Sequence, residues 1–292
     1  MKKGFIIING YSTLSTSLNQ AKRLKEEFEK LGVEISVIKN NEFLCSIKNS
    51  NISCAVKDYD FCIYLDKDKY VSKMLEMAGV RLFNSHESIR VCDDKMETYI
   101  ALAGSGVPIV DTLPGPLCYT QGVKVETSLL DKVENELGYP VIVKSSYGSL
   151  GSGIFKADNR LELENLSNNL IAVPHIFQKF IKESSGLDTR VIVIGGKVVA
   201  SMERRSTTDF RSNIELGGKG YSVELSGENK KVAEKTAKVL GLDYCGIDLL
   251  HSSSGAVVCE VNSNAFFGGI ESVTKVNVAK AYAEHILNVI KS

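Results

Sequence analysis

The segment from Cys245 to Asn262 restricts the fold of this chain more than any other. Two apolar runs flank a polar turn at 251–255, and this pattern predicts a β-hairpin. The hairpin would bring Asp248 near Glu260 and Asn262, and because the last two are two residues apart, their side chains leave the same strand face. Three oxygen-bearing side chains on one face favour a hard cation such as Mg²⁺, although a polar strand edge beside a turn is the alternative interpretation.

The first 90 residues alternate between expected strands and helices. Strands are predicted over 5–8, 33–38 and 61–65, and helices over 18–31 and 70–78. This βαβ order implies a small parallel sheet. The polar loop after the first strand lies where such sheets commonly bind ligands, but the absence of a G-x-G-x-x-G motif there argues against a dinucleotide fold.

Hairpins replace this pattern in the second part of the chain. A strand over 140–144 leads into the glycine-rich segment 145–153, and strands over 188–194 and 197–202 flank a two-glycine turn. Small residues let backbone N–H groups approach phosphate oxygens, so 145–153 is a candidate phosphate loop; a flexible hairpin tip is the alternative. Further helices are expected over 129–137, 229–240 and 277–291.

Length and composition limit the possible classes. With 292 residues, two or three lobes are expected. Lys+Arg and Asp+Glu both number 35, so nothing indicates general binding to nucleic acid or to an anionic membrane. The 7 cysteines include no C-x-x-C pair, which favours reduced thiols in a cytoplasmic protein. No apolar run reaches the length of a membrane span.

Basic and polar side chains gather on predicted strand ends and loops near the proposed metal hairpin. They are Arg190, Arg204, Arg205, Arg211 and Asn213. Each arginine alone suits a solvated strand end. Together with a lysine, a glycine loop and three oxygen ligands, they favour a site for an anionic nucleotide, because guanidinium groups bind phosphate bidentately.

Residues 80–275 resemble the ATP-grasp superfamily, in particular the RimK-like ligases that add glutamate to the tail of a ribosomal protein. The matching segments, in chain order, are 84–85, 94–95, 141–144, 148–153, 178–181, 188–190, 203–205, 210–213, 246–248 and 260–263. Each segment is weakly specific alone, whereas their order and spacing together form a specific signature.

The resemblance implies an α/β (α+β) ATP-grasp fold in three domains. These are an N-terminal βαβ domain over 1–90 that precedes the ATP-grasp unit, a central lid domain over 91–178 and a C-terminal antiparallel-sheet domain over 179–292. It also implies ATP and Mg²⁺ (or Mn²⁺) as cofactors.

The resemblance further assigns a role to each matching position. The nucleotide-binding residues would be Lys95 and Lys144 at the phosphates, Ser149, Gly151 and Gly153 in the closing loop, Gln178, Lys179, Phe180 and Ile181 at the adenine, and Asp188 at the ribose. The metal ligands would be Asp248, Glu260 and Asn262. Arg190, Arg204, Arg211 and Asn213 would be catalytic and face the transferred phosphate.

The implied reaction is that of an ATP-dependent acid–amino-acid ligase. Transfer of the γ-phosphoryl group makes an acyl phosphate, which an amine attacks to give an amide or peptide bond. The expected substrates are an amino acid, such as glutamate, and an amine or peptide acceptor, and a cytoplasmic dimer or tetramer is expected. A small-molecule kinase on the same fold and a nucleotide-binding module without turnover remain alternatives.

Two departures from the family pattern concern the substrate side. The loop 264–271 carries Phe266 and Phe267 where glutamate-adding relatives usually have a proline-containing loop, so the amine substrate is open, and both rings equally suit a core. Lys179 stands where an acidic residue is common, but its expected role uses only backbone atoms. Tyr11, Arg81 and His86 are further candidates for the substrate side.

Overall fold

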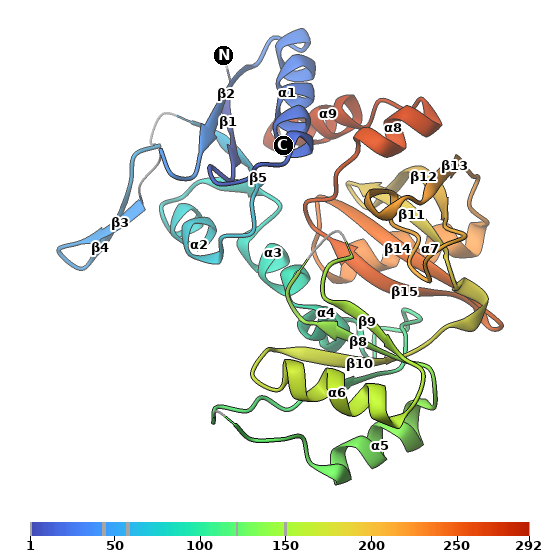
Figure 1. Ribbon diagram of the computed structural model, residues 1–292. Helices are drawn as coiled ribbons and strands as arrows, with labels where there is room; N and C mark the ends of the chain where they lie inside the picture. Colours follow the sequence, from blue (N-terminus) through green and yellow to red (C-terminus); the bar gives the residue numbers. More distant parts are fainter. Residues whose placement is uncertain (1, 43–44, 57–58, 121, 149–150, 292) are drawn as a thin grey trace.

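The computed structural model describes residues 2–42, 45–56, 59–120, 122–148 and 151–291, and it forms three lobes, each built on one larger sheet (Figure 1). The expected α/β class is present, with one parallel sheet followed along the chain by two antiparallel sheets. The ranges 1–90, 91–178 and 179–292 each contain the strands of one of these sheets, and they stay predicted domain boundaries.

The N-terminal lobe is a parallel sheet with strand order β2-β1-β5-β6. Its elements are β1 (Lys3–Ile8), α1 (Ser15–Lys30), β2 (Glu34–Lys39), β5 (Phe61–Leu65), α2 (Lys69–Met77) and β6 (Arg81–Phe83). Residues 4–8 of β1 and all residues of β5 are buried, which explains why both strands read as continuous apolar runs.

A hairpin of β3 (Cys45–Lys48) and β4 (Asn51–Cys54) projects from this lobe (Figure 1). The sequence did not indicate it. Cys45 lies opposite Cys54 in the register, and a disulfide joins them. The expectation that all cysteines are reduced is therefore wrong for this pair, because antiparallel pairing brings together two residues that sequence spacing alone did not connect.

The central lobe follows two helices, α3 (His86–Asp93) and α4 (Lys95–Leu102). It consists of β7 (Thr112–Pro114), α5 (Thr127–Leu137), β8 (Val141–Ser145), β9 (Ile154–Ala157), α6 (Arg160–Leu170) and β10 (His175–Lys179). The strands pair antiparallel in the order β7-β10-β8-β9, and α5 and α6 bury Leu130, Val133 and Leu163 against them. Helix α6 is a further element that the sequence did not indicate.

The C-terminal lobe is an antiparallel sheet with the order β13-β12-β11-β14-β15. Its strands are β11 (Leu187–Ile194), β12 (Lys197–Arg205), β13 (Lys219–Ser222), β14 (Tyr244–Ser252) and β15 (Gly255–Asn262). Its helices are η1 (Lys182–Ser184), η2 (Ile214–Leu216), α7 (Gly227–Val239), α8 (Gly268–Thr274) and α9 (Val278–Lys291). Both predicted hairpins, β11–β12 and β14–β15, are confirmed.

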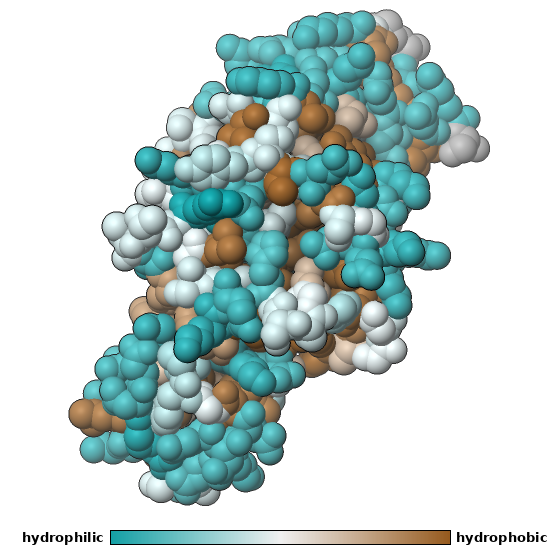
Figure 2. Space-filling model, turned by 90° about the vertical axis from the view of Figure 1, so that its right-hand side faces the viewer, coloured by the Kyte–Doolittle hydropathy of each residue, from teal (hydrophilic) through white to brown (hydrophobic). Residues whose placement is uncertain are grey.

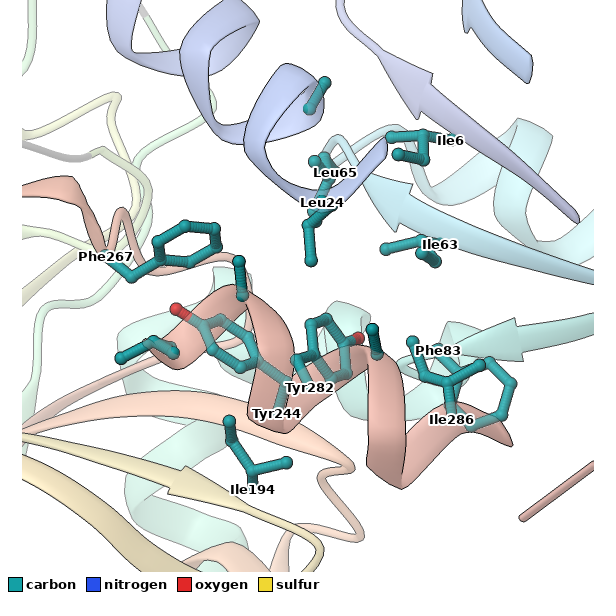
Figure 3. Close-up of a cluster of buried hydrophobic side chains, with 14 of the residues drawn as sticks. Ile6, Leu24, Ile63, Leu65, Phe83, Ile194, Tyr244, Phe267, Tyr282 and Ile286 are labelled. Atoms are coloured by element: carbon teal, nitrogen blue, oxygen red, sulfur yellow. The ribbon is translucent and has the colours of Figure 1, made fainter. Parts of the chain in front are cut away.

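One hydrophobic cluster joins the N-terminal and C-terminal lobes (Figure 3). The rings of Tyr244 and Tyr282 stack with their centroids 4.7 Å apart, and Tyr244 also packs edge-on against Phe267. Leu24 of α1 and Ile63 of β5 belong to the same cluster. Because this apolar contact is continuous, the two lobes form the fixed walls of the space between them.

In the face drawn in Figure 2, hydrophilic side chains cover most of the surface, and hydrophobic side chains show chiefly in recesses between them. Across the described residues, every helix is too short or too polar to span a bilayer.

Candidate functional site

Two cavities meet at the C-terminal sheet. A large cavity of about 640 Å³ lies between the N-terminal and C-terminal lobes, and a smaller pocket of about 90 Å³ lies between the central and C-terminal lobes. Arg204, Asn213 and Glu260 line both of them. These three side chains therefore lie at the boundary between the smaller pocket and the larger cavity.

The β14–β15 hairpin brings the three predicted metal ligands to the boundary between the two cavities. Asp248 pairs with Glu260, and Gly246 pairs with Asn262, next to a register shift after Asp248. A Cβ atom at Gly246 would lie 2.4 Å from the Cβ of Ala265 and 3.3 Å from the Cδ of Arg190, so only glycine leaves room there. The hairpin predicted from the apolar runs thus places the three oxygen-bearing residues as expected.

Asp248 and Asp188 form a buried ion cluster with Arg190 and Arg204. Arg204 donates to both oxygens of Asp188, at 2.7 and 2.5 Å, and approaches Asp248 at 3.0 Å. Arg190 donates to both oxygens of Asp248 through Nε and, at 2.8 Å, through a terminal nitrogen. Burial raises the pKa of Asp248, but the two guanidinium groups outweigh it and lower this pKa to about 2.

Two lysines lie near Glu260 on the side of the central lobe. Lys95, the first residue of α4, donates to the carbonyl of Gly148 at 3.3 Å, and Lys144 of β8 lies 3.4 Å from the sulfur of Cys259. Burial lowers the pKa of Lys95, the charge of Glu260 raises it, and the charge of Lys144 lowers it further. The ammonium group of Lys144 is therefore close enough to lower the pKa of Lys95.

The smaller pocket has the features of a base-binding site. Gln178, Lys179, Phe180 and Ile181, the residues that the resemblance assigns to the adenine, line it together with apolar side chains of Val110, Ile142, Ile154 and Leu250. The amide of Gln178 donates to the hydroxyl of Thr112 at 2.8 Å, and the backbone N–H of Lys179 donates to the carbonyl of Asp111 at 3.0 Å. Apolar walls with a few fixed polar groups suit a flat heterocycle.

The described part of the glycine-rich segment is joined to a residue of this pocket, Arg211. Gly151 and Gly153 have φ values of +77° and +71°, a conformation that favours glycine, whereas Ser149 lies outside the described residues. Arg211 donates to the carbonyl of Gly151 at 2.8 Å, while Asp209 accepts its other N–H groups at 3.0 and 2.7 Å. Arg211 lines only the smaller pocket, so it holds the glycine loop against the C-terminal lobe.

The N-terminal lobe contributes a wall of the large cavity that sequence reasoning largely missed. Asn9 and Ser12 from the loop after β1, and Asp66 and Lys67 after β5, line it. Only the loop after β1 had been indicated, from its place at the carboxyl end of a parallel strand. The same rule, applied to the third predicted strand, would have found Asp66.

The three looser candidates for the substrate side lie elsewhere. Arg81 forms an ion pair with Asp243 at 3.1 Å, and His86 is buried within 3.0 Å of the hydroxyl of Ser72. Tyr11 is 81% exposed. None of these three lines either cavity, so this expectation is not met.

The two phenylalanines of the acceptor loop have different surroundings. Both rings line the large cavity, but only Phe267, which is 1% exposed, also belongs to the cluster that joins the lobes. The loop of 264–271 that the sequence indicated is partly helical, because α8 begins at Gly268.

Comparison with known proteins agrees with this geometry. The family model of the RimK-like ATP-grasp domain matches residues 92–286. Human N-acetylaspartylglutamate synthase A is 38% identical over 228 residues, which are 77% of this chain and 57% of that protein. A probable alpha-L-glutamate ligase 2 of Pseudoalteromonas atlantica is 32% identical over 285 residues, covering 93% and 92% of the two chains. The chain thus spans little more than half of the first relative.

Solved structures share the fold over the full chain. The D-alanine–D-alanine ligase of Bacillus anthracis complexed with ATP superposes with a TM-score of 0.75 at 19% identity, covering 100% of this chain and 99% of that one. The ATP-grasp ligase PsnB, complexed with a variant of its minimal precursor, Mg and ADP, gives a TM-score of 0.71 at 18% identity and the same coverage.

Proposed function

Because this chain belongs to the family of RimK-like ATP-grasp domains, we propose that it is an ATP-dependent carboxylate–amine ligase. One observation carries the proposal: Arg204, Asn213 and Glu260 line both the base-sized pocket and the large cavity. A nucleotide in the smaller pocket would direct its terminal phosphate toward these residues, and an acid bound in the larger cavity would meet it there.

In this proposal the smaller pocket binds ATP. The adenine lies among Gln178, Phe180 and Ile181, and the backbone carbonyls of this segment serve as hydrogen-bond acceptors, because the N–H of Lys179 is already bonded to Asp111. Lys95 and Lys144 contact the phosphates, and Gly151 and Gly153 cover them. The buried ammonium groups suit phosphate, whose charge would offset the mutual repulsion of the two lysines.

The oxygen ligands of the hairpin fit Mg²⁺, with Mn²⁺ as a substitute. Within the described part of the chain, Glu260 and Asn262 make no side-chain hydrogen bond or ion pair and face the large cavity, so their oxygens remain available. Asp248 completes the set with oxygens that Arg190 and Arg204 also contact. When bound there, the metal would offset phosphate charge during transfer, and most of its ligands would come from water and phosphate, since Mg²⁺ needs few carboxylates.

The arginines stabilise the charge that develops during transfer. Asp248 holds Arg190, and Asp188 with Asp248 holds Arg204, so both guanidinium planes are fixed before the substrates bind. We therefore assign Asp188 to the positioning of Arg204 in place of the ribose, since both of its oxygens accept from that arginine. Asn213 lies beside the transferred group, and Arg211 acts through the glycine loop.

The reaction then follows from the two cavities. The γ-phosphoryl group passes to a substrate carboxylate, whose carbon becomes an acyl phosphate with a good leaving group. The lone pair of a neutral amine forms the C–N bond as the C–O bond to phosphate breaks, and phosphate leaves with the electron pair. The proton that the attacking nitrogen loses passes to the leaving phosphate or to water. An amino acid such as glutamate is the proposed substrate, in line with the names of the glutamate ligases and N-acetylaspartylglutamate synthase that the chain resembles.

An assay of ADP and phosphate release tests the function. Purified protein with ATP and Mg²⁺ should release ADP only when both an acid and an amine are present, and mass spectrometry should detect their amide. ADP release that depends on the acid alone, with a stable phosphorylated product, would indicate a kinase. Retention of ATP without turnover across a full panel of acids and amines would indicate a binding module. The cytoplasmic location and the dimeric or tetrameric assembly stay predictions.

A further inference from the structure

The N-terminal wall of the large cavity contains a carboxylate in an unusual setting. Asp66 follows the last residue of β5, is 7% exposed and lines the cavity. It accepts hydrogen bonds from the side-chain amides of Asn9 at 3.2 Å and Asn40 at 2.6 Å, and from the backbone N–H of Lys67 at 2.8 Å. The residues after three adjacent parallel strands therefore hold this carboxylate in one orientation.

The charges around the cavity leave Asp66 without a cation. Among the described lining residues, each cation already has a carboxylate partner: Arg23 has Glu27 at 3.0 Å, Lys67 has Asp93 at 2.8 Å, and Arg190 and Arg204 share Asp248. The three hydrogen bonds to Asp66 all come from neutral donors. A buried carboxylate offers about four lone-pair sites, so about one remains for a ligand.

The surroundings of Asp66 select the class of that ligand. Asn9 and Asn40 turn N–H groups toward the carboxylate, and no group of three His, Cys, Asp or Glu side chains that could hold a metal ion occurs in the described parts of the chain. A metal ion there would have one carboxylate ligand, and the N–H groups around that carboxylate would direct their positive ends toward the cation. An amino group instead supplies one more N–H donor and the positive charge that a buried carboxylate lacks.

We propose that Asp66 binds the amino group of the amine substrate and makes the N-terminal wall of the large cavity its recognition site. This inference rests on the proposed ligase function, and it assigns the two walls of one cavity to different tasks. The C-terminal wall, with Glu260, Asn262 and the arginines, takes the phosphorylated acid. The N-terminal wall selects the amine: Asp66 lies there with neutral groups such as Ser12 and Thr16, and the cations of this wall, Arg23 and Lys67, are paired with Glu27 and Asp93.

The test compares each amino acid that supports ADP release with its analogue that lacks the amino group, for example L-glutamate with glutarate. Binding is measured by calorimetry on the full chain with Mg²⁺ and a non-hydrolysable ATP analogue. Wild-type protein should bind the amino acid at least tenfold more tightly, as expected for a charge-assisted hydrogen bond. Asp66→Asn should remove this preference and raise KM for the amino acid at least tenfold, while KM for ATP changes less than about twofold.

Glu215→Gln is the matched control, because Glu215 lines the same cavity without an ion pair among the described residues but is exposed to water. This variant should keep the preference. The inference is overturned if the wild-type protein binds both ligands equally, a result that needs no variant to fold, or if Asp66→Asn retains the preference. If ADP release still depends on the amine after either result, the ligase function stands. If no amino acid supports ADP release, both proposals are wrong.

Discussion

Asp248 lies directly opposite Glu260 in the antiparallel register of β14 and β15. The two carboxylates nevertheless have different environments. Asp248 is buried and held by two arginines, whereas Glu260 faces both cavities and has no ion-pair partner in the described ranges. The contrast implies that Asp248 fixes the arginines, while Glu260 is free to bind a cation.

Glu260→Gln should lower ADP release at least 100-fold, because the variant loses a charge that would offset the metal. Its melting temperature should stay within a few degrees of wild type, since Glu260 makes no side-chain hydrogen bond or ion pair with other described residues. Glu164→Gln, on the exposed face of α6, is the matched charge-neutralising control and should retain full activity. Normal turnover by Glu260→Gln would refute the metal assignment.

The buried ion cluster should respond to substitution as a unit. Arg204→Met leaves Asp188 with a buried charge and no cation, and we expect the free energy of unfolding to fall by about 3–5 kcal/mol. Adding Asp188→Leu should restore part of that loss, because the second change removes the uncompensated charge. Urea denaturation of the two single variants and the double variant measures the coupling. Additive losses would show that the pair contributes no coupling energy.

Stability at low pH should depend on Glu27 of α1. Burial raises the pKa of Glu27, but hydrogen bonds from Lys30, Asn277 and Arg23 outweigh it and lower the pKa from 4.5 to about 2. A folded-state pKa below the unfolded value stabilises the fold above about pH 4.5, and this contribution is lost as the pH falls toward 2. Its upper limit is about 3 kcal/mol.

Glu27→Gln should therefore be less stable at neutral pH and show a flatter decline between pH 4.5 and 2, as measured by chemical denaturation across that range. Glu29→Gln changes an exposed carboxylate of the same helix and serves as the control. A Glu27→Gln curve parallel to that of wild type would contradict the assignment.

Reduction of the Cys45–Cys54 disulfide should affect only the projecting hairpin. Closing a loop of this size contributes about 2–3 kcal/mol in the chain-entropy estimate. Amide exchange of residues 46–53 should accelerate in the presence of dithiothreitol, while the core strands β1 and β5 keep their protection. ADP release should be unchanged, because neither cysteine lines a cavity. Cys45→Ser under oxidising conditions should reproduce the faster exchange.

The sequence predicted most elements because their patterns are local. The apolar runs of β1 and β5, the glycine turn between β11 and β12, and the alternation in the β14–β15 hairpin each reflect burial along one short segment. The elements it missed include some with weaker patterns: β3 and β4 are short and mostly exposed, and α6 is rich in polar residues.

Local sequence patterns did not predict which partner each charged side chain contacts. Arg211 was expected at the phosphate, but its N–H groups are bonded to Asp209 and Gly151. Asp188 was expected at the ribose, but Arg204 occupies both of its oxygens. A charged group takes the partner that three-dimensional pairing brings nearest, and motif matching supplies only its place along the chain.

The sequence by itself determined the strands, the order of the motifs and the set of oxygen, lysine and arginine side chains that suit a magnesium nucleotide. Only the tertiary structure decided that Asp66 shares a cavity with Glu260 and that Phe267, unlike Phe266, is part of the core that joins the lobes. The physical reason is that hydrophobic periodicity is encoded within a few residues, whereas the walls of a cavity are set by packing between lobes that are distant in sequence.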